Sequence, residues 1–103
     1  MITKVVAIFD KKTKCFTPPY HSKTKGEALR SFMEIVKNPQ TLINKYPEDY
    51  TLYLLGEFDD NLGQFYQNTV IEVGKNKKET VVSKNEPLIE AIECVTKKIN
   101  NES

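Results

Sequence analysis

The chain has 103 residues, of which 39% are hydrophobic and 28% charged, a composition typical of one small globular domain. Fifteen basic and fourteen acidic residues give a formal net charge of +1, which argues against a histone-like protein that coats phosphate. The apolar runs are shorter than the roughly 18 residues of a membrane span, and the first ten residues lack the profile of a signal peptide. We therefore expect a soluble, intracellular protein with no membrane contact.

The first strand is expected over residues 2–9, which are rich in β-branched and aromatic residues and contain neither glycine nor proline. A polar turn follows, and residues 15–17 are expected to return as a short strand beside the first. Two prolines at 18 and 19 should stop that pairing, because proline has no amide hydrogen to donate. We expect an ordered loop over residues 18–23.

The first helix is predicted by the sequence Thr24-Lys25-Gly26-Glu27, which fits a capping box. Apolar residues then recur at helical spacing as far as Val36. Asn38-Pro39 should end the helix, since a residue before proline avoids the α region. A short helical turn is expected over residues 39–45.

A hairpin is predicted from two strand-like runs, residues 50–59 and 64–73, around a four-residue loop that ends in Gly63. This register places Phe58 opposite Phe65, and further along Leu54 opposite Thr69, Leu52 opposite Ile71 and Tyr50 opposite Val73. That face is expected to meet the helix, which leaves Tyr53, Leu55, Tyr66 and Val70 on the other face.

After Gly74 the chain is expected to form a basic linker, with a short strand at residues 81–82. A terminal amphipathic helix is predicted from cap signals at residues 83–87 and from apolar residues at helical spacing, which are Leu88, Ala91, Ile92, Val95 and Ile99. The expected organisation is a core domain over residues 1–74, followed by residues 75–103 as a linker and a helix that packs on the core or on a partner subunit.

The order of these elements predicts an α+β two-layer sandwich, with a small mixed sheet in β-α-β-β order and a C-terminal amphipathic helix. A crossover through the first helix would place the second long strand parallel to the first.

Catalytic and metal-binding chemistry have little support in the sequence. Two cysteines and one histidine are too few for a zinc site, and no phosphate-binding or dinucleotide-binding glycine motif is present. Cys15 and His21 could form a nucleophile and base pair, but a thiol without a catalytic role is the favoured interpretation. We expect a protein that is not an enzyme and holds no cofactor or metal.

The charges are unevenly distributed along the chain. Residues 1–25 carry six lysines and one aspartate, a net charge of +5, whereas residues 26–72 carry three basic and eight acidic groups, a net charge of −5. Lysines beside exposed rings are what a single-stranded nucleic acid requires, because ammonium groups contact phosphates while rings stack on bases. The candidate site consists of Lys11, Lys12, Lys14, Lys23, Lys25, Phe16, Tyr20, Tyr53 and Tyr66. The alternative for each lysine is an ordinary solvated turn.

A second hypothesis is a protein–protein interaction module, in which an apolar surface joins the chain into a homodimer or higher oligomer or binds a host or replication protein. The candidate interface residues are Leu55, Val70, Leu88, Ile92, Val95 and Ile99.

Three segments resemble the small nonstructural protein of gokushovirus-type microviruses, which are phages with circular single-stranded DNA. They are the opening Ile8-Phe9-Asp10, the cap at residues 24–30, and Tyr46-Pro47-Glu48-Asp49-Tyr50 continuing to Asp59-Asp60-Asn61. The likeness covers about residues 2–73, and Leu62 stands where the family's usual loop has threonine. The resemblance implies a phage accessory protein in the host bacterial cytoplasm that binds single-stranded DNA during genome replication or packaging. It supplies no catalytic residue.

Overall fold

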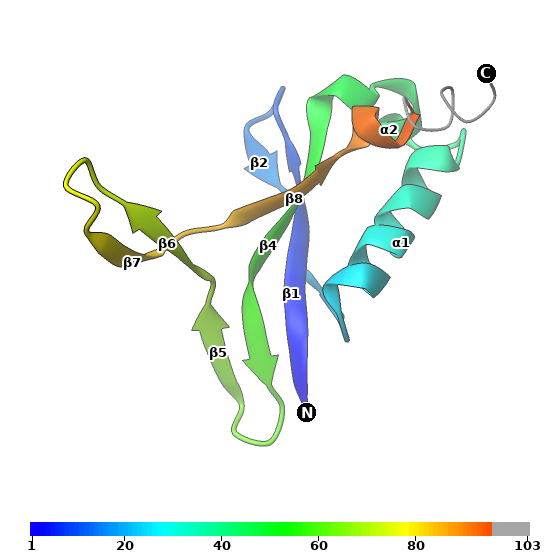
Figure 1. Cartoon of the computed structure of the whole chain (residues 1–103). Helices are drawn as coiled ribbons and strands as arrows, with labels where there is room; N and C mark the ends of the chain where they lie inside the picture. The colour runs from blue at the N-terminus through cyan, green and yellow to red at the C-terminus, as the bar shows by residue number, and fades with distance from the viewer. Residues whose placement is uncertain (96–103) are drawn as a thin grey trace.

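A single antiparallel sheet carries helix α1 on one face and a two-stranded ribbon that projects from its edge (Figure 1). The computed structural model describes residues 1–95. The elements in chain order are β1 (Ile2–Asp10), β2 (Cys15–Phe16), β3 (Tyr20–Ser22), α1 (Lys25–Lys37), α2 (Leu42–Lys45), the 3₁₀ helix η1 (Pro47–Asp49), β4 (Tyr50–Asp59), β5 (Gln64–Gln67), β6 (Thr69–Val73), β7 (Glu79–Ser83) and β8 (Glu86–Glu90). Residues 91–95 are helical.

The two long strands β1 and β4 form the centre of the sheet, with Ile2 opposite Asp59 and Asp10 opposite Tyr50. Each outer edge of this pair is shared by two short strands. β2 and β3 lie end to end along β1, while β5 and β8 lie end to end along β4. The sheet therefore has six strands but is only four strands wide.

The expected mixed α+β sandwich is wrong. Strands make up 45% of the described residues and helices 26%, and every strand pair is antiparallel. The reason is the segment expected to be a loop, whose residues Tyr20–Ser22 form β3 and pair antiparallel with β1. The chain has thus returned to the start of β1 before α1 begins. The crossover through α1 joins β3 to β4, which are parallel to each other, and β1 lies between them.

Helix α1 confirms the sequence prediction. Thr24 is its N-cap, and the Thr24 hydroxyl accepts a hydrogen bond of 3.1 Å from the Glu27 amide. Asn38 ends the helix as predicted, and its amide donates to the Ile35 carbonyl. The short helical turn expected after Pro39 is present as α2.

The predicted hairpin is correct only for its first four pairs. Phe58 lies opposite Phe65, and the pairing ends where Gly56 meets Gln67. β6 then leaves the sheet and pairs with β7, with Ile71 opposite Val81. The expected pairing of Leu54, Leu52 and Tyr50 with residues 69–73 is therefore wrong.

Strand β8 replaces β6 on β4, so the start of the predicted terminal helix is wrong. Residues Glu86–Glu90 pair with Thr51–Leu54, and helix is found only from residue 91. Pro87 is compatible with this strand because β8 lies at an edge and the register shifts beside Pro87. Ile99 lies outside the described residues.

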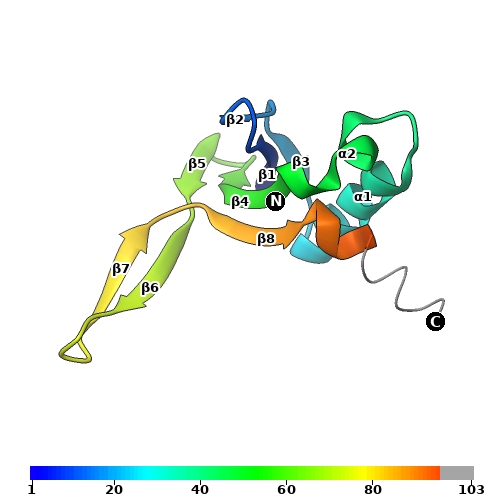
Figure 2. The ribbon, with the colours of Figure 1, turned by 90° about the horizontal axis from the view of Figure 1, so that it is seen from above.

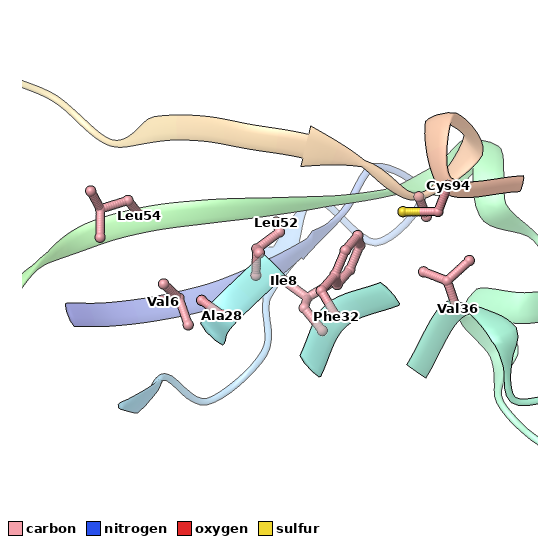
Figure 3. Packing of buried hydrophobic residues seen from close by; sticks show 9 residues of the cluster. Val6, Ile8, Ala28, Phe32, Val36, Leu52, Leu54 and Cys94 are labelled. Atoms are coloured by element: carbon pink, nitrogen blue, oxygen red, sulfur yellow. The ribbon is translucent and has the colours of Figure 1, made fainter. Parts of the chain in front are cut away.

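The core lies between α1 and one face of the sheet (Figure 3). Helix α1 contributes Ala28, Phe32 and Val36, which are at most 1% exposed. The sheet and the last described turn contribute Val6, Ile8, Leu52, Leu54, Ala91 and Cys94. The helical periodicity read from residues 28–36 therefore identifies the buried side of α1 correctly.

We call the β6–β7 ribbon, residues 69–83, the arm. It points away from the sheet and from both helices (Figure 2). The expected boundary between residues 74 and 75 falls in the turn at its tip. Within the described residues no helix is long and apolar enough to cross a membrane.

Candidate nucleic-acid interface

The sheet face opposite α1 is the open face. Val6 and Ile8 point into the core, and side chains alternate along a strand, so Val5, Ala7 and Phe9 belong to the open face. Among the described residues no helix packs over this side (Figure 2). Rings cover it instead, in two groups.

The first ring cluster consists of Phe9, Phe16 and Tyr53. The Phe9 and Phe16 centroids are 4.8 Å apart, and Phe16 meets Tyr53 edge to face at 5.4 Å. Phe9 and Tyr53 are also edge to face, at 6.1 Å. Three strands, β1, β2 and β4, thus each contribute one ring to a packed group.

The second ring cluster consists of His21, Phe58 and Phe65, from β3, β4 and β5. The Phe58 and Phe65 centroids are 4.6 Å apart, and His21 lies 5.5 Å from Phe58 and 6.5 Å from Phe65. The His21 Nδ1 is 3.0 Å from the hydroxyl oxygen of Thr3, which fixes the imidazole against the sheet.

The first cluster exposes one ring to solvent and the second exposes two, His21 and Phe65. Phe16 is 42% exposed and Phe65 is 63% exposed. Beside Phe65 lies an open hollow of about 270 Å³, lined by Val5, Leu55, Gly56, Glu57, Phe65, Tyr66 and Gln67. The open face therefore presents two stacking surfaces, one at each end of β1.

A β-bulge places the second cluster on the open face. Val5 pairs with Gly56 and Val6 pairs with Leu54, so Leu55 is an additional residue in β4. The extra residue reverses the alternation of β4, and Phe58 and Phe65 lie on the open face rather than against the helix. The register expected from the sequence put this pair on the helix face, so Phe58 and Phe65 were missing from the predicted site, as were Phe9 and His21. A glycine inside a strand, here Gly56, is the signal that could have indicated the bulge.

Two of the five predicted lysines are held by carboxylates. The Lys11 ammonium is 2.7 Å from Glu90, and this hydrogen bond is the main reason that the Lys11 pKa is raised. The Lys25 ammonium is 3.1 Å from Glu86. Lys12, Lys14 and Lys23 have no ion pair within residues 1–95.

Two of these unpaired lysines lie close in sequence to the ring clusters. Lys14 precedes Phe16 by two residues, and Lys23 follows His21 by two residues. Lys14 also has a positive φ of 59°, because it closes the tight turn between β1 and β2. Each cluster therefore has an unpaired lysine two residues away in the chain.

Two predicted stacking residues lie elsewhere. Tyr20 pairs with Val6 and packs against the core, and its hydroxyl is buried with no hydrogen-bond partner among the described residues. Burial also raises the Tyr20 pKa. Tyr66 is 44% exposed, but it alternates with Phe65 along β5 and so points to the other face.

The structure separates Cys15 from His21. Cys15 pairs with Asp10 and its thiol donates to the Thr13 carbonyl, whereas His21 pairs with Val5. Five positions along a strand correspond to about 16 Å. In residues 1–95 no three His, Cys, Asp or Glu side chains are grouped so that they could hold a metal ion.

The predicted interface residues do not form one surface. Leu88 and Val95 pack against the core, and Ile92 is 36% exposed. Leu55 lies in the bulge of β4, and Val70 lies on the arm.

The fold and the open face define an antiparallel sheet protein that carries two exposed ring clusters. Its sequence matches the family described as Phage ORF5 protein over residues 3–79, and the chain belongs to that family. Protein ORF5 of Chlamydia phage 1 is 30% identical over 64 residues, and the match covers 58% of this chain and 67% of that relative. No solved structure matches the chain significantly. The expected likeness to a microvirus protein is confirmed at the level of this phage family.

Proposed function

We propose that this phage protein binds single-stranded DNA on the open face, with bases stacked on Phe16 and Phe65. The observation that carries the proposal is the pair of ring clusters, each with a solvent-exposed phenylalanine ring. Every base has a π-face, so stacking of this kind needs no particular sequence.

The dimensions of the open face suit a short stretch of nucleic acid. The first cluster is anchored at Phe9, and the second lies opposite Thr3, six residues away along β1. Six residues of a strand span about 20 Å. That separation allows one DNA strand to stack on both Phe16 and Phe65 with several nucleotides between the two stacked bases.

The charges agree with a modest, salt-dependent affinity. Lys14 and Lys23 are free of ion pairs within the described residues and lie two residues from Phe16 and His21 in the chain, and Lys12 is a third cation in the same turn as Lys14. Few phosphate contacts per copy are consistent with a net charge of only +1. Each contact should contribute a slope of about −0.7 to the dependence of log K on log salt.

The test is a fluorescence anisotropy titration of a labelled oligothymidine of about 15 nucleotides at about 50 mM and about 200 mM salt. Phe16→Ala and Phe65→Ala should each weaken binding by about 5- to 150-fold, because stacking contributes about 1–3 kcal/mol per base. Leu62→Ala is the control, because Leu62 is 71% exposed and lies outside both clusters.

Two outcomes would contradict the proposal. Wild-type protein that does not bind the oligonucleotide at the lower salt concentration would exclude this function. Binding that both ring variants retain in full would exclude the open face as the site.

A further inference from the structure

The arm exposes a row of large aliphatic side chains. Ile71, Val73 and Val81 are 65%, 64% and 69% exposed. Ile71 lies opposite Val81, and Val73 follows Ile71 by two residues, so all three share one face of the ribbon. An isolated two-stranded ribbon is marginally stable in water, and this apolar face would be stabilised by a partner surface.

The tip of the arm carries three lysines in a structured turn. The Gly74 amide donates to the Lys78 carbonyl and the Lys77 amide donates to the Gly74 carbonyl, both at 2.9 Å. The ammonium groups of Lys75, Lys77 and Lys78 have no ion pair within residues 1–95. Glu79 lies opposite Val73 and offsets one of the three charges, so the arm ends in a net charge of +2.

The root of the arm fixes the direction in which it projects. The Asn68 amide donates to the Leu55 carbonyl of β4 at 2.9 Å, and the Asn68 carbonyl accepts from Lys84 at 2.8 Å. The Asn68 side chain donates to the Lys84 carbonyl at 2.9 Å. These bonds tie both strands of the arm to the sheet at one point, and the tip points away from α2 (Figures 1 and 2).

A hollow of about 350 Å³ lies at the other end of the molecule, between the end of β1 and the α2–η1 segment. Its apolar part includes Leu42, which is 61% exposed, and Tyr46, which is 52% exposed. We call it the α2 hollow, and it is lined by Asp10, Lys12, Leu42, Tyr46, Asp49 and Tyr50.

Asp10 and Asp49 line the α2 hollow and Glu48 precedes Asp49 in the chain, while Lys12 also lines the hollow and Lys11 lies near Asp49. Within residues 1–95 neither Glu48 nor Asp49 forms an ion pair, and Asp10 accepts only backbone amides, from Lys12 at 2.8 Å and from Thr13. The pKa of Tyr50 is raised first by burial and then by Asp10 and Asp49. Asp10 and Asp49 thus share the lining of the hollow with Lys12.

We propose that the arm of one copy docks in the α2 hollow of a second copy of this chain. Val73 would pack on Leu42 and Tyr46, and the tip lysines would approach Glu48 and Asp49. The arm is apolar with a net positive tip, and the hollow is apolar with three carboxylates at or beside it that outnumber Lys12 and the Glu90-paired Lys11, so the two are complementary in polarity and in charge. Both belong to the same chain, and the bonds of Asn68 keep a copy's own arm turned away from its own hollow.

The test is the mass of the assembly in solution, measured without DNA by sedimentation velocity and light scattering. Wild-type protein should form a dimer or larger oligomer at micromolar concentration. Lys75→Glu with Lys78→Glu on the arm, or Glu48→Lys with Asp49→Lys at the hollow, should each give monomers. Arg30→Glu with Lys37→Glu is the matched control, because it changes two exposed charges on α1 and should leave the assembly intact.

Charge complementation decides whether the two surfaces meet. An equimolar mixture of the arm variant and the hollow variant should assemble, and a chain that carries all four substitutions should assemble with itself. Circular dichroism and thermal unfolding show that each variant is folded.

Four outcomes would overturn the proposal. They are a monomeric wild type, oligomers that survive either pair of substitutions, an arm variant that dissociates while the hollow variant does not, and a mixture that stays monomeric. Dissociation of the arm variant alone would indicate that the arm pairs with a second arm, or that a different protein occupies the α2 hollow. Because no DNA is present, assembly can succeed or fail independently of nucleic-acid binding.

Discussion

Gly56 lies so close to β5 that a Cβ atom built on it would be 2.1 Å from the carbonyl oxygen of Tyr66. This contact is with backbone, so it cannot be relieved by rotating a side chain. Gly56 therefore allows the backbone of Tyr66 to pass close to β4 where the β4–β5 pairing ends. Gly56 also lies next to the bulge that sets the position of the second ring cluster.

We predict that Gly56→Ala destabilises the protein by about 2–4 kcal/mol, the range expected for a severe backbone clash. Gly26→Ala is the matched control. Its Cβ would be 3.7 Å from the Thr24 hydroxyl, an ordinary contact, and alanine in the first turn of α1 should stabilise by about 0.5 kcal/mol. Urea denaturation measures both changes. Equal stability of the two variants would contradict this account of Gly56.

The hydroxyl of Tyr20 is buried without a hydrogen-bond partner among the described residues. Tyr20→Phe removes this unsatisfied group and keeps the ring, so we expect a gain of about 1 kcal/mol in the free energy of unfolding. Urea denaturation of wild type and Tyr20→Phe at neutral pH measures this difference in the free energy of unfolding. A loss of stability would show that the hydroxyl has a partner in solution.

The raised pKa of Tyr20 also predicts a pH dependence. The unfolded chain ionises this phenol near pH 10, whereas the folded chain keeps it neutral to higher pH. The free energy of unfolding is thus unaffected by this ionisation below pH 10, and it falls as the pH rises from there toward the folded pKa. The stability gain of Tyr20→Phe over wild type should therefore grow above pH 10. Lys11 and Tyr50 are present in both proteins, so their own shifts cancel in this comparison.

Local signals in the sequence predicted the local structure well. The capping box at Thr24 gave the start of α1, and the apolar spacing gave its buried face. Gly63, with φ of 62°, closes the predicted hairpin, and Phe58 meets Phe65 as expected. Each of these features depends on residues close together in the chain.

The arrangement of the strands depends on competition between distant segments, which periodicity does not reveal. β4 has one free edge, and both β6 and β8 could pair with its first half. Leu88 and Ile89 of β8 pack against the core there, whereas β6 has no core contact. Phe58 and Phe65 of the second ring cluster were missed for a related reason. One additional residue at Leu55 moves every later side chain of β4 to the other face.

Asn68 provides a separate test of the arm's root. Asn68→Ala removes the side-chain bond to the Lys84 carbonyl but keeps the backbone bonds, so we expect a local loss of about 1 kcal/mol. Amide hydrogen exchange in β6 and β7 should become roughly five-fold faster, while exchange in α1 and β1 stays unchanged. Asn61→Ala is the control, because no hydrogen bond of the Asn61 side chain is formed within residues 1–95. Faster exchange throughout the sheet would mean that Asn68 stabilises the whole fold rather than the arm.

Lys14 and Lys23 should affect the salt dependence of DNA binding more than Lys25 does. Lys14→Ala and Lys23→Ala should each reduce the slope of log K against log salt by about 0.7, because each removes one phosphate contact. Lys25→Ala is the matched control, since the Lys25 ammonium already pairs with Glu86 at 3.1 Å. Titrations at four salt concentrations give the slopes. If Lys25→Ala lowers the slope as much as the other two substitutions do, phosphate is attracted by the general charge of the N-terminal segment, and the cations beside Phe16 and His21 have no special part in binding.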